Sequence, residues 1–194
     1  MRPWLAREPR RALDLCTGSG CLAVLTALEF PKARIDAADL SAAALQIARI
    51  NIRKFKLGKR IRTIRSDLFQ SIKKQKYHLI VSNPPYVTAR SMRRLPREYR
   101  HEPPVALAAG ADGLDLVRRI LEEAKNHLAP GGLLVCEIGG NRKALERAYP
   151  RLEFAWPETS DGSGSVFILE RGQLDASSTA ALPRTSSRLL RRRG

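Results

Sequence analysis

Residues 12–28 read ALDLCTGSGCLAVLTAL: a short apolar run, a turn with two glycines and a second apolar run. Ala12–Leu15 has the length and composition of a buried strand, and Cys21–Leu28 is predicted to form a helix. Glycines in the intervening turn, Cys16–Gly20, let the main chain bend sharply and approach a ligand closely. A strand that passes through such a turn into a helix predicts the first unit of an α/β sheet.

The same alternation continues along the chain. Strands are predicted at 34–38, 61–65, 78–81 and 133–138, and helices at 41–55, 113–128 and 141–149. The helix capped by Ser41 is expected to bury Leu45, Ala48, Ile52 and Phe55. Segments 152–156 and 165–169 flank the turn 161–164 and predict a closing hairpin. We therefore predict a mostly parallel sheet with helices on both faces and a C-terminal antiparallel hairpin.

The chain has 194 residues, enough for one sizeable core. We expect a linker or truncated N-terminus at 1–11, a folded domain at 12–171 and a disordered basic tail at 172–194. No apolar run approaches the length of a membrane span and the first residues lack an apolar signal region, so a cytoplasmic location is expected. The three cysteines form no Cys-x-x-Cys pair, so neither a disulfide framework nor a metal site is predicted.

The net charge of +16 predicts attraction to a polyanion, most plausibly nucleic acid. Part of this charge lies in the tail, and five arginines lie within 90–100. This loop and the tail are candidate contacts to nucleic acid, and the loop could instead meet acidic protein groups or simply be solvated.

Polar residues follow each of the first four predicted strands. They are Gly18 and Gly20 after the first strand, Asp39 after the second, Asp67 after the third and Asn83 after the fourth. Ligands of parallel α/β sheets bind outside the carboxyl ends of the strands, at the point where the strand order reverses. The sequence therefore predicts a ligand site at this edge of the sheet.

The turn Thr17-Gly18-Ser19-Gly20, with Asp39 placed 19 residues after Gly20, suits an adenosine-containing cofactor, because an acidic residue there can bind ribose hydroxyls. This pair does not separate nicotinamide from S-adenosylmethionine. The absence of a full G-x-G-x-x-G spacing favours S-adenosylmethionine. Asp67, with Leu68 and Phe69, could place an acid and apolar atoms at the adenine, although Asp67 could instead be a helix N-cap.

The stretch Ser82-Asn83-Pro84-Pro85-Tyr86 follows the fourth strand and is predicted to carry the chemistry. Two prolines cannot continue a ladder, so the chain leaves the sheet along a rigid path. The Asn83 amide offers an acceptor and two donors, and Tyr86 adds a flat ring with a polar tip. Together they suit a planar, nitrogen-bearing group such as a carboxamide or a nucleobase.

Three stretches, Leu15–Cys21, Glu98–Pro103 and Leu107–Asp115, together with Asn-Pro-Pro-Tyr at 83–86, resemble the N(5)-glutamine methyltransferases that modify translation proteins. The branch they resemble most acts on a glutamine of large-subunit ribosomal protein uL3. The resemblance covers about residues 11–170. It implies a Rossmann-like class I S-adenosylmethionine-dependent methyltransferase with a mostly parallel seven-stranded sheet. Members also carry an N-terminal helical domain that helps dock the protein substrate, whereas this chain begins almost at its first predicted strand.

The resemblance also implies roles for individual residues. Contacts to S-adenosylmethionine are implied for Cys16, Thr17, Gly18, Ser19, Gly20, Asp39, Leu68 and Asn83. The glutamine carboxamide would be held by Asn83, Pro84, Pro85 and Tyr86, of which Asn83, Pro84 and Tyr86 are the expected catalytic residues.

Amide nitrogen is a poor nucleophile because its lone pair is delocalised into the carbonyl. Acceptors at Asn83 Oδ1 and the Pro84 carbonyl would favour a pyramidal nitrogen and stabilise the positive charge that grows on it. No histidine base is required. Two alternatives remain open from the sequence. One is an amino-methyltransferase acting on adenine N(6) of a flipped base, and the other is a truncated homologue that binds cofactor without turnover.

Overall fold

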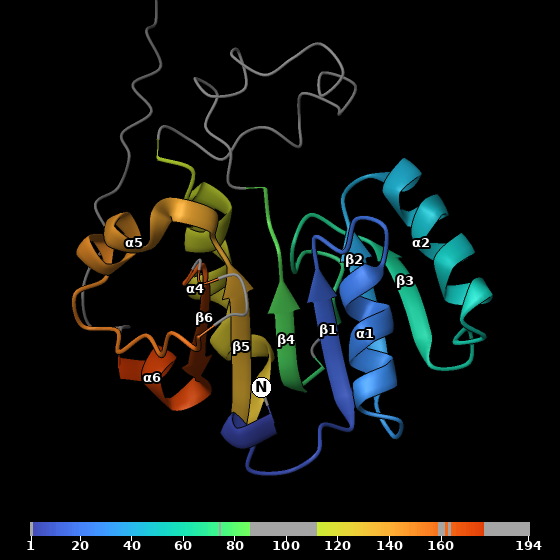
Figure 1. Ribbon diagram of the computed structural model, residues 1–194, viewed down its shortest axis with the longest axis horizontal. Helices are drawn as coiled ribbons and strands as arrows, with labels where there is room; N and C mark the ends of the chain where they lie inside the picture. The colour runs from blue at the N-terminus through green and yellow to red at the C-terminus, as the bar shows by residue number, and fades with distance from the viewer. Residues whose placement is uncertain (1, 74, 86–111, 159–161, 163, 177–194) are drawn as a thin grey trace, which may run out of the picture.

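The computed structural model describes residues 2–73, 75–85, 112–158, 162 and 164–176. Its centre is a six-stranded sheet in the order β3-β2-β1-β4-β5-β6 (Figure 1). The strands are β1 Arg11–Leu15, β2 Arg34–Asp39, β3 Ile61–Arg65, β4 Tyr77–Ser82, β5 Leu128–Glu137 and β6 Val166–Glu170. All neighbouring pairs are parallel except β5 with β6. The prediction of a mostly parallel α/β sheet is confirmed.

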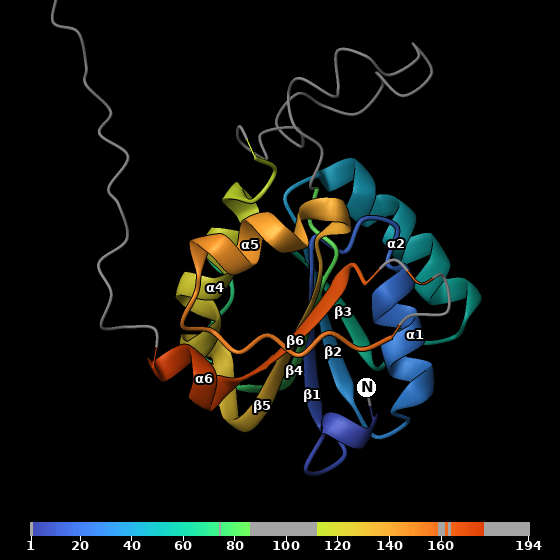
Figure 2. The ribbon, with the colours of Figure 1, turned by 60° about the vertical axis from the view of Figure 1, so that its left-hand side comes forward.

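Helices cover both faces of this sheet (Figure 2). They are α1 Cys21–Glu29, α2 Ala42–Lys54, α4 Asp115–His127, α5 Arg142–Ala148 and α6 Arg171–Ala176, with short 3₁₀ turns at Arg2–Trp4 and Gly139–Asn141. One core lies between the sheet and α1 with α2, and the other lies against α4, α5 and α6. None of the helices in these ranges has the length and apolarity needed to span a bilayer.

Strand β1 is the centre of both cores, because its side chains alternate between the two faces. Leu13 and Leu15 belong to the core under α4, whereas Ala12 belongs to the core under α1 and α2. Each of these side chains is fully buried. The small Ala12 leaves room for α1, whose Ala23 and Ala27 pack in the same core. The apolar pattern of residues 12–15 therefore reflects a strand covered on both faces.

Helix α2 begins and ends within one residue of its predicted bounds, but the turn that ends it was not predicted. The Ser41 hydroxyl accepts a hydrogen bond from the Ala44 amide at 3.2 Å, which confirms it as the N-cap. At the other end the amides of Lys56 and Leu57 bond back to the carbonyls of Arg53 and Ile52, both at 2.9 Å. This pair of bonds is a Schellman motif, and Lys56 takes the left-handed conformation that it requires.

The Schellman motif corrects one predicted core residue. Leu45, Ala48 and Ile52 are buried as expected, but Phe55 is 50% exposed. The chain turns out of the helix at this point, and Leu57 is the residue that returns to the core beside Ile52. Helical periodicity placed Phe55 on the buried face only because it assumed that the helix continued.

The entry to β5 is bulged. Tyr77 pairs with Leu128, and the next pair is Leu79 with Leu133, so β5 carries extra residues at this point. A Cβ atom on Gly132 would lie 2.8 Å from the Ala129 carbonyl oxygen and 2.9 Å from that of Tyr77, so only glycine fits. The sequence prediction treated residues 130–132 as a break between a helix and a strand, whereas the structure makes them part of the strand.

The C-terminal part of the sheet corrects two predictions. The segment 152–156 pairs with β6 only through an isolated antiparallel bridge between Ala155 and Ile168, so the sheet has six strands in the described ranges and the seventh is not confirmed. Helix α6 extends into the predicted disordered tail, because residues 172–176 belong to it and Leu174 is buried. One apolar residue per turn was too weak a signal against the surrounding polar residues.

Candidate functional site

The turn after β1 is shaped by left-handed residues. Cys16, Gly18 and Gly20 have φ angles of 57°, 53° and 81°. The turn is closed by a hydrogen bond from the Gly20 amide to the Thr17 carbonyl at 2.8 Å and tied to β2 by one from the Thr17 amide to the Ala38 carbonyl at 3.0 Å. Gly20 is also a contact point between helices, because a Cβ there would lie 3.1 Å from the Cβ of Ala48 on α2. At Gly18 the same Cβ would meet open space.

Asp39, at the end of β2, holds this turn in place. Its Oδ2 accepts a hydrogen bond from the Gly18 amide at 2.8 Å, and its Oδ1 accepts one from the Ser41 amide at 2.8 Å. A carboxylate oxygen can accept two hydrogen bonds, so each oxygen retains one free lone-pair direction. The structure thus brings together the glycine turn and the acid that the sequence analysis paired with it.

Asn51 is a second anchor of the turn that the sequence analysis missed. Its side-chain amide donates to the Ser19 carbonyl at 2.9 Å, across 32 positions of sequence. Asn51 lies on α2, one turn beyond the buried Ala48. An asparagine inside a helix is a weak signal alone, because its partner is defined only when α1 and α2 pack together.

Asp14 is the other residue that the sequence analysis missed. It lies on β1, is fully buried, and accepts a hydrogen bond from the Thr17 hydroxyl at 2.5 Å on Oδ2. Its Oδ1 has no hydrogen-bond partner within the described part of the chain. Burial raises the pKa of Asp14 to about 7, against the opposing effect of the Thr17 hydrogen bond. An acidic residue inside the apolar run of β1 was the available signal.

The thiol of Cys16 is close enough to the carboxylates of Asp39 and Asp14 to be affected by their charge. Burial first, and then the carboxylates of Asp39 and Asp14, raise the pKa of its thiol to about 12. The thiol therefore stays protonated at physiological pH and is not an activated nucleophile. Its place in the turn, partly buried against the core under α4, is that of a neutral lining group.

Asp67 and Leu68 follow β3 and lie in a series of turns. Asp67 is ion-paired at 3.0 Å with Arg119 of α4. Residues 68–73, which directly follow it, form turns and not a helix, so Asp67 is not the N-cap considered as an alternative. Leu68 is buried with a φ of 46° and its carbonyl accepts the Ser66 hydroxyl at 2.6 Å. Phe69 stacks on His127, with the ring centres 4.5 Å apart, and is therefore committed to the core.

Asn83 lies where β4 leaves the sheet. The Ser82 hydroxyl donates to the Leu15 carbonyl at 2.9 Å, which ties the end of β4 to the end of β1. Asn83 is exposed directly after this bond, while Pro84 is buried and Pro85 is half-buried. The two prolines thus anchor the chain and leave the asparagine side chain at the sheet edge. Tyr86 and the arginine-rich loop 90–100 lie outside the described residues, as does the tail 177–194.

Pairing across the sheet brings these segments side by side. Leu15 pairs with Ala38 on one side and with Ser82 on the other, so the ends of β1, β2 and β4 are level. The amide of Ser66 bonds to the carbonyl of Asp39 at 2.9 Å, which adds the end of β3. The glycine turn, Asp39, Asp67 and Asn83 consequently share one edge of the sheet, the upper edge in Figure 1.

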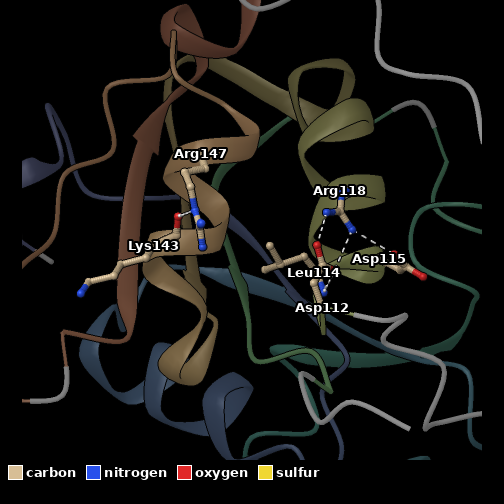
Figure 3. A network of polar contacts seen from close by, with 6 residues as sticks. All are labelled: Asp112, Leu114, Asp115, Arg118, Lys143 and Arg147. Carbon is tan, nitrogen blue, oxygen red and sulfur yellow. Dashed lines mark hydrogen bonds and ion pairs between the residues drawn. The ribbon is translucent and has the colours of Figure 1, made fainter. Parts of the chain in front are cut away.

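The start of α4 forms a polar network beside this edge (Figure 3). Arg118 is ion-paired with both Asp112 and Asp115, and Asp112 also accepts a hydrogen bond from the Leu114 amide at 3.1 Å. The Arg118 guanidinium lowers the pKa of Asp112 below its usual range. Asp112, Leu114 and Asp115 belong to the third stretch that carries the family resemblance. In this structure they fix the first turn of α4.

Comparison with known proteins identifies related sequences. A family model described as "Methyltransferase small domain" matches residues 3–95. Proteins named ribosomal protein uL3 glutamine methyltransferase are 54% identical over 176 residues in Neisseria meningitidis serogroup B and 48% identical over 178 residues in Bordetella pertussis. Each alignment covers 90% of this chain and 58–59% of the relative. The chain therefore spans just under three fifths of the length of the curated relatives that it matches.

Solved structures agree on the fold. A ribosomal protein L11 methylase from Lactobacillus delbrueckii subsp. bulgaricus has a TM-score of 0.58 at 16% identity, covering 87% of this chain and 72% of that one. A methyltransferase from Pyrococcus furiosus has a TM-score of 0.58 at 21% identity, covering 82% and 74%. The chain has the α/β fold of these methyltransferases.

Proposed function

Since this chain is homologous over 90% of its length to the ribosomal protein uL3 glutamine methyltransferases, we propose that it is the catalytic domain of such an enzyme. It would transfer a methyl group from S-adenosylmethionine to the side-chain amide nitrogen of a glutamine in uL3. The observation that carries the proposal is the position of Asn83, exposed at the end of β4 beside the turn that Asp39 orders.

The residues of the site fit an adenosine-containing cofactor. Asp39 has a free lone-pair direction on each oxygen for ribose hydroxyls. The Cβ position of Gly18 faces open space, so the main chain can approach a ligand there. Cys16, Thr17, Ser19 and Gly20 would complete the cradle, and Asp67 with Leu68 would border the adenine side. S-adenosylmethionine supplies an electrophilic methyl group on a sulfonium.

The protein's part in the reaction is to bind and orient the glutamine amide. Asn83 Oδ1 and the Pro84 carbonyl would accept its two N–H groups and draw the nitrogen away from planarity, which restores its lone pair. Pro85 and Tyr86 would hold the plane of the amide. These acceptors would stabilise the positive charge that develops on the nitrogen as it takes up the methyl group, and the nitrogen would then lose one proton to water. Positioning accounts for much of the rate, so no histidine base is needed.

The substrate in the cell would be uL3 within a ribosomal assembly particle, in the cytoplasm. The net charge of +16 supports this, because a basic enzyme is repelled by a free basic protein and attracted to a particle that contains rRNA. The loop 90–100 and the tail would contribute to this attraction.

The test is a transfer assay with tritiated S-adenosylmethionine. Ribosomes, free uL3 and assembly particles would come from cells that lack the activity. Asn83→Ala would be compared with wild type and with Asn126→Ala, a matched change of an exposed asparagine on α4. We expect label in one protein, mapped to a glutamine, lost by more than about 100-fold in Asn83→Ala and retained in Asn126→Ala.

Other outcomes would overturn the proposal. Label in RNA would assign the enzyme to adenine N(6) methylation. Absence of label in every fraction, with cofactor binding intact, would identify a chain that binds cofactor without turnover.

A further inference from the structure

A long part of the chain carries basic residues without any acidic ones. The 27 residues 40–66 contain no aspartate or glutamate, and they contain eight basic residues: Arg49, Arg53, Lys54, Lys56, Lys59, Arg60, Arg62 and Arg65. They lie on the C-terminal half of α2, the turn that follows it and β3. We call this surface the α2–β3 basic edge.

The fold leaves this surface uncovered. β3 is the last strand of the sheet on its side, so no further strand in the described ranges pairs with it (Figure 1). Helix α2 packs beside β3, with the Arg49 Nε donating to the Thr63 hydroxyl at 2.9 Å. Because α2 returns from the carboxyl end of β2 to the start of β3, its last turn lies at the edge of the sheet opposite Asp39 and Asn83. Arg53, Lys54, Lys56 and Lys59 are thus separate from the proposed catalytic site, whereas Arg65, at the other end of the basic edge, pairs with Asp39.

Arg60 and Arg62 each form several hydrogen bonds within the protein, and Arg49 and Arg65 form one each, to the Thr63 hydroxyl and to the Leu40 carbonyl. Arg62 is bound through two nitrogens to the carboxylate of Asp36, both at 2.9 Å. Arg60 donates to main-chain carbonyls at the end of α1, with the shortest bond, to Ala27, at 2.8 Å. The other six form no ion pair within the described part of the chain. Four of these, Arg53, Lys54, Lys56 and Lys59, are exposed within seven consecutive residues.

These four charges are presented by an ordered turn. The Schellman motif ties Lys56 and Leu57 to the last turn of α2, and Leu57 is buried in the core. Phe55 lies among the four cations with half of its surface exposed. An exposed aromatic ring in the middle of a fixed cationic surface is what an unpaired base can stack on while phosphates bind around it.

We propose that the α2–β3 basic edge binds RNA, with Arg53, Lys54, Lys56 and Lys59 on backbone phosphates and Phe55 against an unpaired base. Phosphates spaced along a nucleic-acid strand match a row of separate cations, and their binding releases condensed counterions. These four cations lie at the opposite edge of the sheet from Asn83, so one ribosomal particle could occupy both sites at once. RNA binding here does not depend on which group is methylated.

The test measures binding of a fluorescein-labelled RNA hairpin, with a single-stranded loop, by anisotropy across a KCl series. The variant Lys54→Glu/Lys56→Glu/Lys59→Glu is compared with Lys143→Glu/Arg147→Glu/Arg151→Glu. The second variant changes three exposed basic residues on and beside α5 by the same charge; Lys143 and Arg147 are drawn in Figure 3. Both are full-length chains, so the loop 90–100 and the tail contribute equally to each.

We expect the first variant to weaken binding by at least about tenfold and to flatten the salt dependence by about 2 to 3 units of slope, with a clearly smaller change in the second. Phe55→Ala should weaken binding about tenfold and leave the salt slope unchanged, because it removes stacking and no phosphate contact. A set of Lys→Gln changes at 54, 56 and 59 replaces the charge reversal if that variant fails to fold.

Three results would overturn the proposal. Equal losses in the two triple variants would mean that the whole basic surface binds without a preferred site. Binding to vesicles containing phosphatidylserine, lost in the first variant while RNA binding is retained, would assign the surface to membranes. Unchanged RNA affinity in the first variant and in Phe55→Ala would remove the site altogether. Methyl transfer is assayed separately, so its failure is distinguishable from each of these.

Discussion

Gly18 and Gly20 lie two positions apart in the same turn, yet a methyl group would meet different surroundings at each. Both have a positive φ, so alanine is strained by about 1–2 kcal/mol at either position. At Gly20 the new Cβ would also press on Ala48 at 3.1 Å, and forced overpacking adds about 1–3 kcal/mol.

We therefore expect Gly20→Ala to lower the free energy of unfolding by about 2–5 kcal/mol and Gly18→Ala by about 1–2 kcal/mol, measured by urea denaturation. Cofactor titration on the folded fraction should show weaker binding in Gly20→Ala, because α1 must shift away from α2. A greater loss of stability in Gly18→Ala would contradict this account of the turn.

The raised pKa of Asp14 predicts that the free energy of unfolding depends on pH. Its pKa is raised from 3.8 to about 7 by burial, so the native state binds a proton that the unfolded state has already released between these values. Stability contributed by this residue is complete below about pH 4 and falls as the pH rises towards 7. Between pH 5 and 8 the loss is about 2–3 kcal/mol.

Asp14→Asn should remove this loss, since an amide does not titrate and its oxygen can still accept the Thr17 hydroxyl. Urea unfolding of both proteins at pH 5 and pH 8 measures the difference. The same pH dependence in wild type and variant would show that Asp14 does not titrate in this window.

At the level of secondary structure, Lys56 at the end of α2 adopts a left-handed backbone conformation that non-glycine residues rarely take. Lys56 has a φ of 57° at the position after the helix cap, where glycine is most often found. Lys56→Gly should raise the free energy of unfolding by about 1 kcal/mol, because it removes the left-handed strain. Lys54→Gly, inside the last turn of the helix, is the control and should lower it by about 1 kcal/mol. If both variants have a lower free energy of unfolding than wild type, the left-handed conformation of Lys56 does not reduce the stability of the protein.

The elements themselves were largely predictable. The six helices and strands from residue 11 to residue 82 have boundaries within about one residue of those predicted. Long apolar runs and the glycine turn are local signals, and they remain when the chain folds. The burial of Phe55, the structure of residues 172–176 and the bulge at Gly132 were predicted wrongly, because each depends on what the chain packs against next.

For the domain as a whole, the strand order explains why the proposed site lies where it does. β1 is flanked by β2 on one side and β4 on the other, so the glycine turn lies between Asp39 and Asn83. β1 is followed in the chain by α1 on one face of the sheet, and β4 is followed by α4 on the opposite face. The strand order reverses between β1 and β4, which is the position where such folds bind ligands. The basic edge follows from the same order, because β3 is the outermost strand.

The sequence was sufficient to determine the α/β alternation, the glycine turn and the polar residues at four strand ends, because each is encoded by neighbouring residues. It also identified Asp39 as the partner of the turn, since that spacing recurs wherever a strand, helix and strand follow one another. Only the tertiary structure revealed the buried carboxylate of Asp14, the bond from Asn51 to Ser19 and the uncovered edge of β3. These features depend on segments tens of residues apart, and burial or exposure exists only after the elements have packed.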